Sequence, residues 1–247
     1  MRQAQDSEII RLSMWVREGK SIKDFKTSNS EVMIISPKEL TTGMYSWADQ
    51  ILCATNSKRN TINAQVRRLN NFGPEPQIGD KIISLQNHWE FFSSGNLRTQ
   101  DSDSKNSRVE PAPLTNGSIG TIETLQQSHI TLPLYIGNGT IPILYTTMYN
   151  EDGDHFAGIP VDYTALTTGT KLLTPQQEYK MKKSLGCPNP PFEFAYAYGI
   201  TTWKAQGSEW KKVLGFEESF PYEKETHQKF LYTMITRASE KLVLVKK

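Results

Sequence analysis

The sequence predicts an α/β fold into which a small antiparallel β-barrel is inserted, and three stretches carry this prediction. An apolar run at residues 50–54 is followed by a polar turn and a helical pattern, the order that is typical of a parallel α/β sheet. Residues 78–145 hold short β-rich runs separated by Gly, Asn and Pro, which is typical of a small barrel. After Asp162 the α/β pattern resumes, so the barrel interrupts one sheet.

The first predicted element is an amphipathic helix near the N-terminus. Apolar residues recur at roughly helical spacing over residues 9–16, and Asp6 or Ser7 is a candidate N-cap. Gly19 stands where a C′ glycine ends a helix. The elements that follow are predicted as strands at residues 32–35 and 50–54 and a helix through residues 62–69.

The inserted part is predicted to contain four strands, at residues 81–85, 119–124, 130–135 and 141–145. Between the first two, ten of the sixteen residues at 93–108 are Ser, Thr, Asn or Asp. Such a stretch has too little apolar surface to offset the entropy of ordering, which predicts a mobile loop at 93–112.

The C-terminal part returns to alternating strands and helices. Strands are predicted at residues 194–202, 213–216 and 242–245, and helices at 175–185 and 224–236. We therefore expect a discontinuous α/β domain made of residues 1–77 and 160–247, with the barrel at 78–159.

Composition excludes several classes of protein. The chain has 247 residues, 28 basic and 26 acidic, so its formal charge of +2 does not by itself indicate nucleic acid. No apolar run approaches the length of a membrane span, and the N-terminus lacks a signal pattern, so we expect a cytoplasmic protein without a membrane partner. Cys53 and Cys187 have no Cys or His at ligand spacing, which argues against a disulfide scaffold or a zinc site.

Two C-terminal segments carry the strongest functional signal. Residues 200–209 read Ile-Thr-Thr-Trp-Lys-Ala-Gln-Gly-Ser-Glu after a predicted strand, and residues 231–238 read Leu-Tyr-Thr-Met-Ile-Thr-Arg-Ala at the end of a predicted helix. They resemble motifs V and VI of superfamily-one helicases. The strand that leads into the first segment is similar to that of RecD-like and Dda-like members.

Three further stretches resemble the same family. Residues 1–10 resemble its motif IV, and residues 51–63 resemble a strand and helix joined by a Thr-Asn turn. Residues 79–87 and 116–120 resemble the Src-homology-3-like barrel that these enzymes insert into the second motor domain. The resemblance implies a RecA-like (P-loop-NTPase-type) second motor domain of an ATP-dependent DNA helicase, with the first motor domain outside this chain.

The nucleotide-site candidates follow from this resemblance and from the chemistry of phosphoryl transfer. An arginine delivered from a second domain stabilises charge on the γ-phosphate, and Arg237 fits this role of arginine finger. Arg2 would be a second γ-phosphate contact, by resemblance to motif IV. Gly207 allows close backbone approach to a ligand, and the Glu209 carboxylate can accept a hydrogen bond from a ribose hydroxyl. Gln206 either couples the ATP and DNA sites or makes a structural turn contact.

The candidates for DNA contacts lie mostly in the same segments. Thr202 is placed to bind a DNA phosphate, and Thr55 and Asn56 form the turn that resembles a family feature. Lys204, and Asn116 in the barrel, complete the candidates by resemblance. Trp203 stands where the family usually has His, and it can either stack on a base or pack under the turn.

A basic helix offers a further candidate DNA surface. Lys58, Arg59, Arg67 and Arg68 belong to a stretch without acidic residues, and they either face a phosphate backbone or form a solvated helix face.

The chain lacks the motifs that hold ATP and Mg²⁺ in the first motor domain. Gly19-Lys20-Ser21 mimics the end of a P-loop, but Met14 stands where the first glycine of that loop belongs. No apolar strand ends in the Asp-Glu pair that holds Mg²⁺. We therefore expect ATP and Mg²⁺ to be held mainly by a first RecA-like motor domain, no metal site here, and an inactive chain when isolated.

The sequence thus predicts the C-terminal portion of an ATP-dependent DNA helicase that translocates on single-stranded DNA and unwinds duplex. From family resemblance alone, the direction is 5′ to 3′. Met1 falls directly before the motif IV arginine, which predicts a fragment or one half of a split gene.

Two other classes of protein compete with the helicase. The alternative is a catalytically inactive, stand-alone nucleic-acid-binding or regulatory module that kept the fold. A Cys-His hydrolase using Cys53 or Cys187 has no supporting local pattern.

Overall fold

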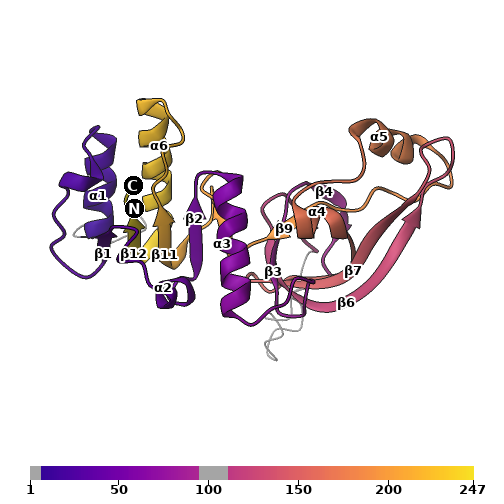
Figure 1. Cartoon of the computed structure of the whole chain (residues 1–247), viewed down its shortest axis with the longest axis horizontal. Helices are drawn as coiled ribbons and strands as arrows, with labels where there is room; N and C mark the ends of the chain where they lie inside the picture. The colour runs from indigo at the N-terminus through magenta and orange to yellow at the C-terminus, as the bar shows by residue number, and fades with distance from the viewer. Residues whose placement is uncertain (1–6, 95–110) are drawn as a thin grey trace, which may run out of the picture. The chain divides into compact units, whose positions relative to one another are not determined.

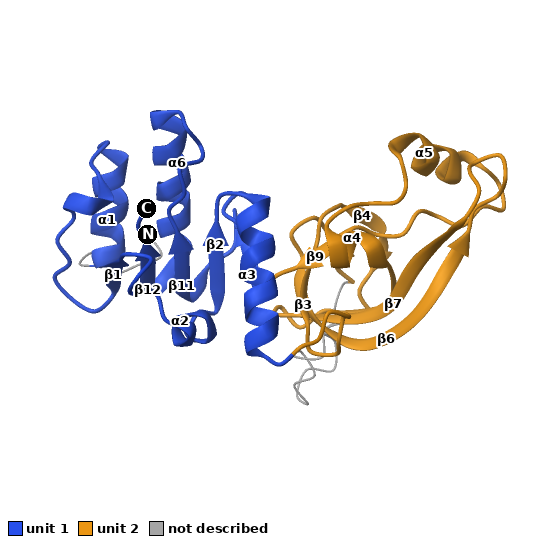
Figure 2. Ribbon diagram, in the orientation of Figure 1, with its two compact units in different colours: residues 1–71, 198–247 blue, residues 72–197 orange. Residues whose placement is uncertain are grey.

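A computed structural model describes residues 7–94 and 111–247, and the chain divides into two compact units (Figure 2). The first unit comprises residues 1–71 and 198–247, and the second comprises residues 72–197. Arg2 and most of the predicted loop at 93–112 lie outside the described residues.

The division differs from the predicted domain boundaries in two segments. Residues 72–77 and, more extensively, 160–197 were assigned to the α/β domain, but both belong to the second unit. The longer segment decides the difference. The reason is strand pairing, because the strands at both ends of this segment pair within the antiparallel sheet of that unit.

The first unit is built on a parallel sheet of five strands, which confirms the predicted α/β class (Figure 1). In spatial order the strands are β1 (Val32–Ile35), β12 (Ala238–Val245), β11 (Trp210–Phe216), β2 (Gln50–Cys53) and β10 (Gly199–Thr201). Each neighbouring pair is parallel. Because helices cover both faces of such a sheet, its strands are nearly continuous apolar runs, as β2 and the end of β12 are.

Helices pack on opposite faces of this sheet. α2 (Thr42–Trp47) and α3 (Asn56–Leu69) share a core with alternate residues of the central strands, such as Leu214 and Phe216. α1 (Glu8–Arg17) packs against α6 (Lys224–Ile235), whose Met234 lies against Gly215 on the other face.

Both predicted ends of the first helix are confirmed. The Ser7 hydroxyl accepts a hydrogen bond from the Ile9 N–H at 3.3 Å, as an N-cap does. Gly19 follows the helix with φ of 81°, the left-handed conformation that only glycine adopts readily. A short 3₁₀ helix, Ile22–Asp24, comes next.

The edge strand β10 is bound to α3 through the side chain of Asn63, which pairs with backbone groups that a neighbouring strand would otherwise pair with. The Asn63 amide donates to the Gly199 carbonyl at 3.1 Å and accepts from the Gly199 N–H at 2.7 Å. A Cβ at Gly199 would lie 2.6 Å from Cγ2 of Ile62, so only glycine allows this close approach. The helix therefore satisfies backbone groups that an edge strand leaves unpaired.

We expect Asn63→Ala to destabilise the chain by about 2 to 4 kcal/mol, because two buried backbone groups of Gly199 lose their partner. Urea unfolding followed by circular dichroism measures this loss. The matched control is Asn60→Ala on the exposed side of the same helix, which should cost less than about 0.5 kcal/mol. Equal losses for the two variants would contradict the assigned role.

The second unit contains a five-stranded antiparallel sheet and a two-stranded sheet, so its predicted antiparallel character is confirmed. The large sheet has the order β8 (His155–Asp162), β7 (Thr140–Asn150), β6 (Ile119–Thr131), β3 (Lys81–Ser84) and β9 (Phe194–Tyr196). The small sheet pairs β4 (His88–Phe92) with β5 (Pro113–Leu114). The Src-homology-3-like barrel stays a prediction.

Two strand predictions were wrong for physical reasons. Two strands were predicted at 119–124 and 130–135, but residues 119–131 form one strand, because the backbone between the two predicted strands also pairs with β7. The predicted strand at 194–202 divides into β9 and β10, which belong to different sheets. β4, β5 and β8 were not predicted.

Two helices complete the second unit. α5 (Pro175–Lys183) begins with a capping box between Thr174 and Gln177, close to the predicted start. α4 (Tyr163–Thr168), which was not predicted, is capped by Asp162 and ends at Gly169. Among the described residues, the helices are all too short or too polar to cross a membrane.

Candidate functional site

The candidate site lies where three strands of the parallel sheet end. β2, β10 and β11 are followed by the Thr55–Asn56 turn, by Thr202–Trp203 and by Glu217–Glu218. Because the carboxyl ends of parallel strands meet at one edge, these segments share the edge at which ligands bind in open α/β sheets. We call it the carboxyl edge.

Glu218 fixes the Thr55–Asn56 turn. Its carboxylate accepts from the Thr55 N–H at 3.1 Å and the Thr55 hydroxyl at 2.7 Å, and also from the Ala54 N–H. The Thr55 hydroxyl in turn accepts from the Lys58 N–H at 3.2 Å as the N-cap of α3. Thr55 thus positions the turn, and Asn56 is the exposed side chain at its tip.

Thr202 departs from the predicted phosphate contact. It is 1% exposed, and both its hydroxyl and its N–H donate to the Cys53 carbonyl, at 3.2 and 2.9 Å. The buried hydroxyl therefore joins the ends of β10 and β2 and is not available to DNA in this structure. Lys204 follows in the same turn, where its N–H donates to the Thr201 carbonyl at 2.9 Å.

Trp203 packs on the protein and stays accessible. Its ring stacks on Phe230 with centroids 5.4 Å apart and planes at 20°, yet 43% of the residue is exposed. Phe220 lies beside it at 6.2 Å, and Tyr222 meets Phe220 edge-on at 5.9 Å. Trp203, Phe220 and Tyr222, with exposures of 43%, 42% and 85%, form what we call the aromatic surface.

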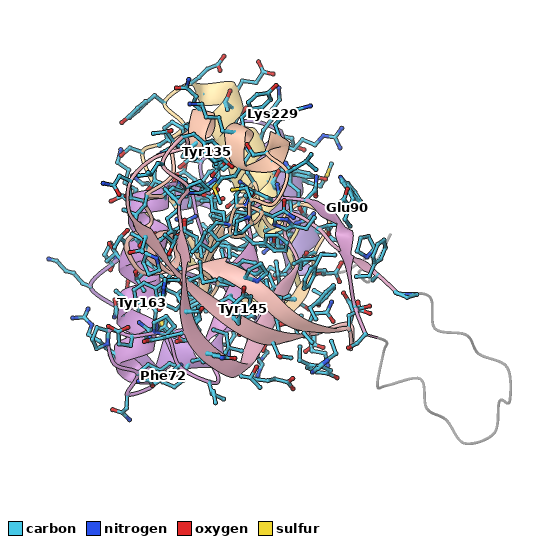
Figure 3. The ribbon with its side chains drawn as sticks, turned by 90° about the vertical axis from the view of Figure 1, so that its right-hand side faces the viewer. Phe72, Glu90, Tyr135, Tyr145, Tyr163 and Lys229 are labelled. Carbon is cyan, nitrogen blue, oxygen red and sulfur yellow. The ribbon has the colours of Figure 1, made fainter. Side chains whose placement is uncertain are left out.

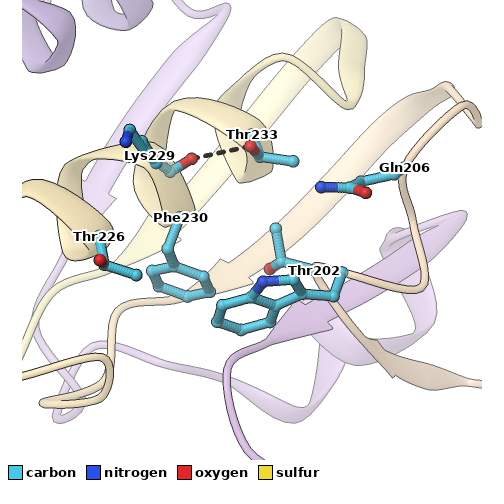
Figure 4. Close-up of a pocket in the computed structure, with 7 residues that line it drawn as sticks. Thr202, Gln206, Thr226, Lys229, Phe230 and Thr233 are labelled. Carbon is cyan, nitrogen blue, oxygen red and sulfur yellow. Dashed lines mark hydrogen bonds between the residues drawn. The ribbon is translucent and has the colours of Figure 1, made fainter.

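A pocket of about 210 Å³ opens beside Trp203 (Figure 4). Phe230 of α6 and Gln206 of the loop after β10 face it from different elements. Gln206 is exposed, and its N–H donates to the Trp203 carbonyl at 3.4 Å. The lining residues are Thr202, Trp203, Gln206, Thr226, Lys229, Phe230 and Thr233.

Arg237 joins the two segments that resemble helicase motifs. Its Nη1 donates to the Ser208 carbonyl at 2.9 Å and its Nε to the Thr233 carbonyl at 3.1 Å. Nη2 donates to the Thr236 hydroxyl at 3.2 Å, and the Arg237 carbonyl accepts from the Trp210 N–H at 2.8 Å. The guanidinium is therefore half-buried and held in one orientation at the loop that precedes β11.

Two other nucleotide-site candidates lie in this loop. Gly207 has φ of 91°, and a Cβ there would meet no atom within 4 Å, so its backbone borders open space. Glu209 is exposed directly before β11. Gly207, Glu209 and Arg237 thus lie at the starts of β11 and β12. Asn56 and Trp203 instead follow the ends of β2 and β10, at the carboxyl edge.

The predicted basic helix face is only partly present. Arg67 is 7% exposed and belongs to the buried side of α3, so it cannot face a phosphate backbone with the others. The Lys58 ammonium lies 4.5 Å over the Phe216 ring, and the Arg59 guanidinium donates to Asn60 at 3.1 and 3.2 Å. Lys58 and Arg59 therefore place positive charge beside the Thr55–Asn56 turn.

The environment of Cys53 argues against its use as the nucleophile of a Cys-His hydrolase. Burial and, less strongly, Glu218 raise the pKa of this thiol to about 12, although Arg59 and Lys58 act in the opposite direction. A thiol with this pKa is not a thiolate at neutral pH and cannot act as a nucleophile. Within the described ranges, no group of three or more His, Cys, Asp or Glu is placed to hold a metal.

The segment that resembles motif IV shows a buried carboxylate that the sequence did not indicate. Glu8 is 1% exposed and accepts from the Ser28 hydroxyl at 2.9 Å, the Asn29 N–H at 3.2 Å and Arg11 at 2.6 Å. Burial acts to raise its pKa, but these hydrogen bonds, together with a stronger contribution from the Ser28 N–H, outweigh it and the pKa lies below the ordinary value. Glu8 thus holds the loop that leads to β1.

Three residues of the site were missed from the sequence alone, and one residue that was predicted lies in the second unit. Glu218, Phe220 and Tyr222 were not predicted, although an acidic and aromatic segment directly after a buried strand is a readable signal. Asn116 belongs to the second unit, where its N–H donates to the Asn87 side-chain oxygen at 2.8 Å.

Comparison with known families identifies the C-terminal segment. Residues 196–245 match the model of the family described as UvrD-like helicase C-terminal domain. This segment holds β10, β11, α6 and β12, including both stretches that resemble motifs V and VI. This segment is therefore similar to a helicase C-terminal domain. No curated protein matches the sequence.

The fold has relatives among solved structures. The Pif1 helicase from Candida albicans matches with 15% identity and a TM-score of 0.50, over 99% of this chain and 54% of that chain. Two Bacteroides Pif1 structures, one with ADP-AlF3 and ssDNA and one bound to ssDNA, match with 15% and 14% identity and TM-scores of 0.45 and 0.46. Each match covers 99% of this chain and 50% of that one.

The likeness to the Candida albicans structure concerns the fold, and it confirms the predicted RecA-like α/β architecture. The chain spans about half the length of the helicases it matches. The comparisons do not distinguish RecD-like or Dda-like members, so that finer assignment stays a prediction.

Proposed function

We propose that this chain, whose residues 196–245 match the model of a UvrD-like helicase C-terminal domain, is the second motor portion of an ATP-dependent DNA helicase. The observation that carries the proposal is the contact between the two motif-like segments, in which Arg237 donates to the Ser208 carbonyl at 2.9 Å. This contact couples the end of α6 to the loop after β10. A change at the nucleotide can thereby reach the loop that begins with Trp203.

On the nucleotide side, the chain supplies residues that act on ATP held elsewhere. ATP and Mg²⁺ bind mainly to a first RecA-like motor domain, because this sequence lacks the P-loop and the Asp-Glu pair. Arg237 is the arginine finger, Glu209 accepts from the ribose, and the open backbone at Gly207 approaches the nucleotide. Arg2 remains a second candidate contact to the γ-phosphate.

On the DNA side, the carboxyl edge is the proposed track for single-stranded DNA. Lys58 and Arg59 supply positive charge beside the exposed Asn56, and the aromatic surface supplies faces for base stacking. Thr202 and Thr55 contribute as positioning residues, since their hydroxyls are bound within the protein. Alternating closure of the two motor domains would then move the strand along this edge.

The direction of movement, 5′ to 3′, rests on the family resemblance alone. Strand displacement with the complete helicase on substrates that carry a single 5′ or 3′ tail tests it.

We expect weak, sequence-tolerant binding of single-stranded DNA that falls with salt. A site with about two to four phosphate contacts should lose roughly tenfold or more in affinity between about 50 and 200 mM salt, given a slope of about −0.7 per phosphate. Fluorescence anisotropy with unrelated sequences measures both properties. A flat salt dependence or a strict sequence requirement would contradict the proposed track.

The decisive experiment measures DNA-stimulated ATP hydrolysis with and without a first motor domain. We expect no turnover by the isolated chain, and turnover when a P-loop motor domain is supplied in the same or a second polypeptide. Turnover by the isolated chain that follows the protein through purification contradicts the division of roles. DNA binding without turnover in the complete protein instead supports the alternative, an inactive nucleic-acid-binding module.

A further inference from the structure

The second unit contains a cavity that the proposed helicase function does not use. It has a volume of about 570 Å³, within the range of small-molecule sites. It is enclosed by the segment that begins β4, by α5 and by the stretch before β9, all within this unit. The lining residues are Gln86, Asn87, His88, Trp89, Glu90, Phe91, Glu178, Lys182, Asn189, Pro190, Pro191 and Phe192.

The walls of this cavity are aromatic and firmly packed. The His88 ring stacks on Phe192 with centroids 3.5 Å apart and planes at 13°, and Phe91 meets Phe192 edge-on at 5.4 Å. Trp89 is 63% exposed, although it is a large aromatic residue. Figure 3 shows Glu90, the next residue of β4, at the surface of the second unit. A flat ligand can therefore meet a packed aromatic wall and an exposed indole.

The polar groups of the cavity are mostly neutral. Burial and the neighbouring Lys182 lower the pKa of His88 to about 4, so its ring is uncharged at neutral pH. Its buried Nε2 has no hydrogen-bond partner among the described residues. Asn87 and Asn189 add amide groups. The Asn87 oxygen is already used by the N–H of Asn116, which fixes the orientation of that amide.

Three charged residues line the cavity: Glu178 is bound within the protein, whereas Glu90 and Lys182 are exposed at its border. Glu178 is paired with Lys171 at 3.0 Å, and Lys171 also binds Glu193 at 2.9 Å. Gln86 donates to the same Glu193 at 3.1 Å. Lys182 is exposed on the last turn of α5, where it can meet an anionic group of a ligand.

We propose that this cavity binds a nucleobase, which stacks on Trp89 while amide and imidazole groups contact its edge and Lys182 contacts the attached phosphate. Amide side chains pair with base edges, and aromatic faces stack on any base. The base can belong to single-stranded nucleic acid or to a free nucleotide, since both present the same chemistry. The inference does not rest on the proposed helicase function, because it concerns the second unit and needs no ATP hydrolysis.

Binding to the full chain can be followed through the indole N–H resonances of ¹⁵N-labelled tryptophan, with Trp89 assigned by Trp89→Phe. The probes are deoxyadenosine monophosphate, deoxyadenosine and a short deoxythymidine oligonucleotide. We expect the Trp89 resonance to shift with the monophosphate or with the oligonucleotide. A shift with the monophosphate alone identifies a free nucleotide as the source, and a larger effect of the oligonucleotide identifies a nucleic acid strand.

Matched variants separate stacking from phosphate contact. Trp89→Ala should weaken binding of the monophosphate about fivefold or more, whereas Tyr179→Ala, equally exposed on α5 but outside the cavity, should leave it unchanged. Lys182→Ala should weaken the monophosphate and spare deoxyadenosine, with Lys180→Ala as its control.

Two results would overturn the inference. They are a Trp89 resonance that no nucleobase probe moves, and equal effects of Trp89→Ala and Tyr179→Ala on binding of the monophosphate. Neither depends on ATP turnover or on the carboxyl edge, so failure here is distinguishable from failure of the proposed function.

Discussion

Arg237→Lys is expected to abolish most ATP hydrolysis by the complete helicase while single-stranded DNA affinity stays within about twofold. Lysine keeps the charge but loses the planar fork that contacts two oxygens at once, so the substitution separates geometry from charge. Arginine fingers contribute about 10³ to 10⁵ in rate. Steady-state kcat with saturating DNA measures the loss, and anisotropy measures DNA affinity.

The internal hydrogen bonds of Arg237 make a stability control necessary. Its Nη2 donates to the Thr236 hydroxyl, so Thr236→Ala removes one of these bonds and leaves the guanidinium in place. We expect this variant to retain most activity, as should Arg68→Lys on the exposed side of α3. If Arg237→Lys keeps more than about a tenth of kcat, Arg237 is a structural residue.

Loss of the aromatic surface is expected to have the second largest effect. Trp203→Leu should weaken single-stranded DNA binding by the chain about fivefold to a hundredfold, because stacking on one aromatic side chain is worth about 1 to 3 kcal/mol per base. Leucine still covers Phe230, so the packing beneath is largely kept. Trp203→Tyr retains a stacking face and should lose much less. Anisotropy at low salt compares the variants.

Tyr222 provides an independent test of the same surface. It is 85% exposed, so Tyr222→Ala should weaken DNA binding with little change in the free energy of unfolding. Tyr232→Ala, on the neighbouring α6 and 36% exposed, is the control for loss of a tyrosine. If both Trp203→Leu and Tyr222→Ala bind DNA unchanged, the aromatic surface does not contact DNA. Trp203 then serves only to pack on Phe230.

Local sequence patterns were sufficient where a structure depends on neighbouring residues. The N-cap at Ser7 and the glycine after α1 were both readable, because capping chemistry acts within one helical turn. The strand at residues 32–35 was predicted with its observed bounds, because a buried parallel strand is an uninterrupted apolar run. The resemblance to superfamily-one helicases was readable in the same way, because residues 200–209 and 231–238 are each a continuous stretch of sequence.

Local patterns failed where a distant pairing decided the outcome. One apolar run at 194–202 was predicted as one strand, yet its two ends pair with β3 and β2 in different sheets. Residues 119–124 and 130–135 were predicted as separate strands, but pairing with β7 joins residues 119–131 into one strand. Neither pairing partner is visible in the local pattern.

The sequence by itself determined the α/β class, the helicase-like motifs and the candidacy of Arg237. Only the tertiary structure decided what the side chains at those motifs are free to do. Thr202 and Arg67 have the polarity expected of DNA contacts, but both are nearly buried. The sequence left two roles for Trp203, packing under the turn or stacking on a base. In the structure its ring packs on Phe230, and 43% of the residue stays exposed. Burial and hydrogen-bond partners come from residues far away in the chain, so no local pattern can specify them.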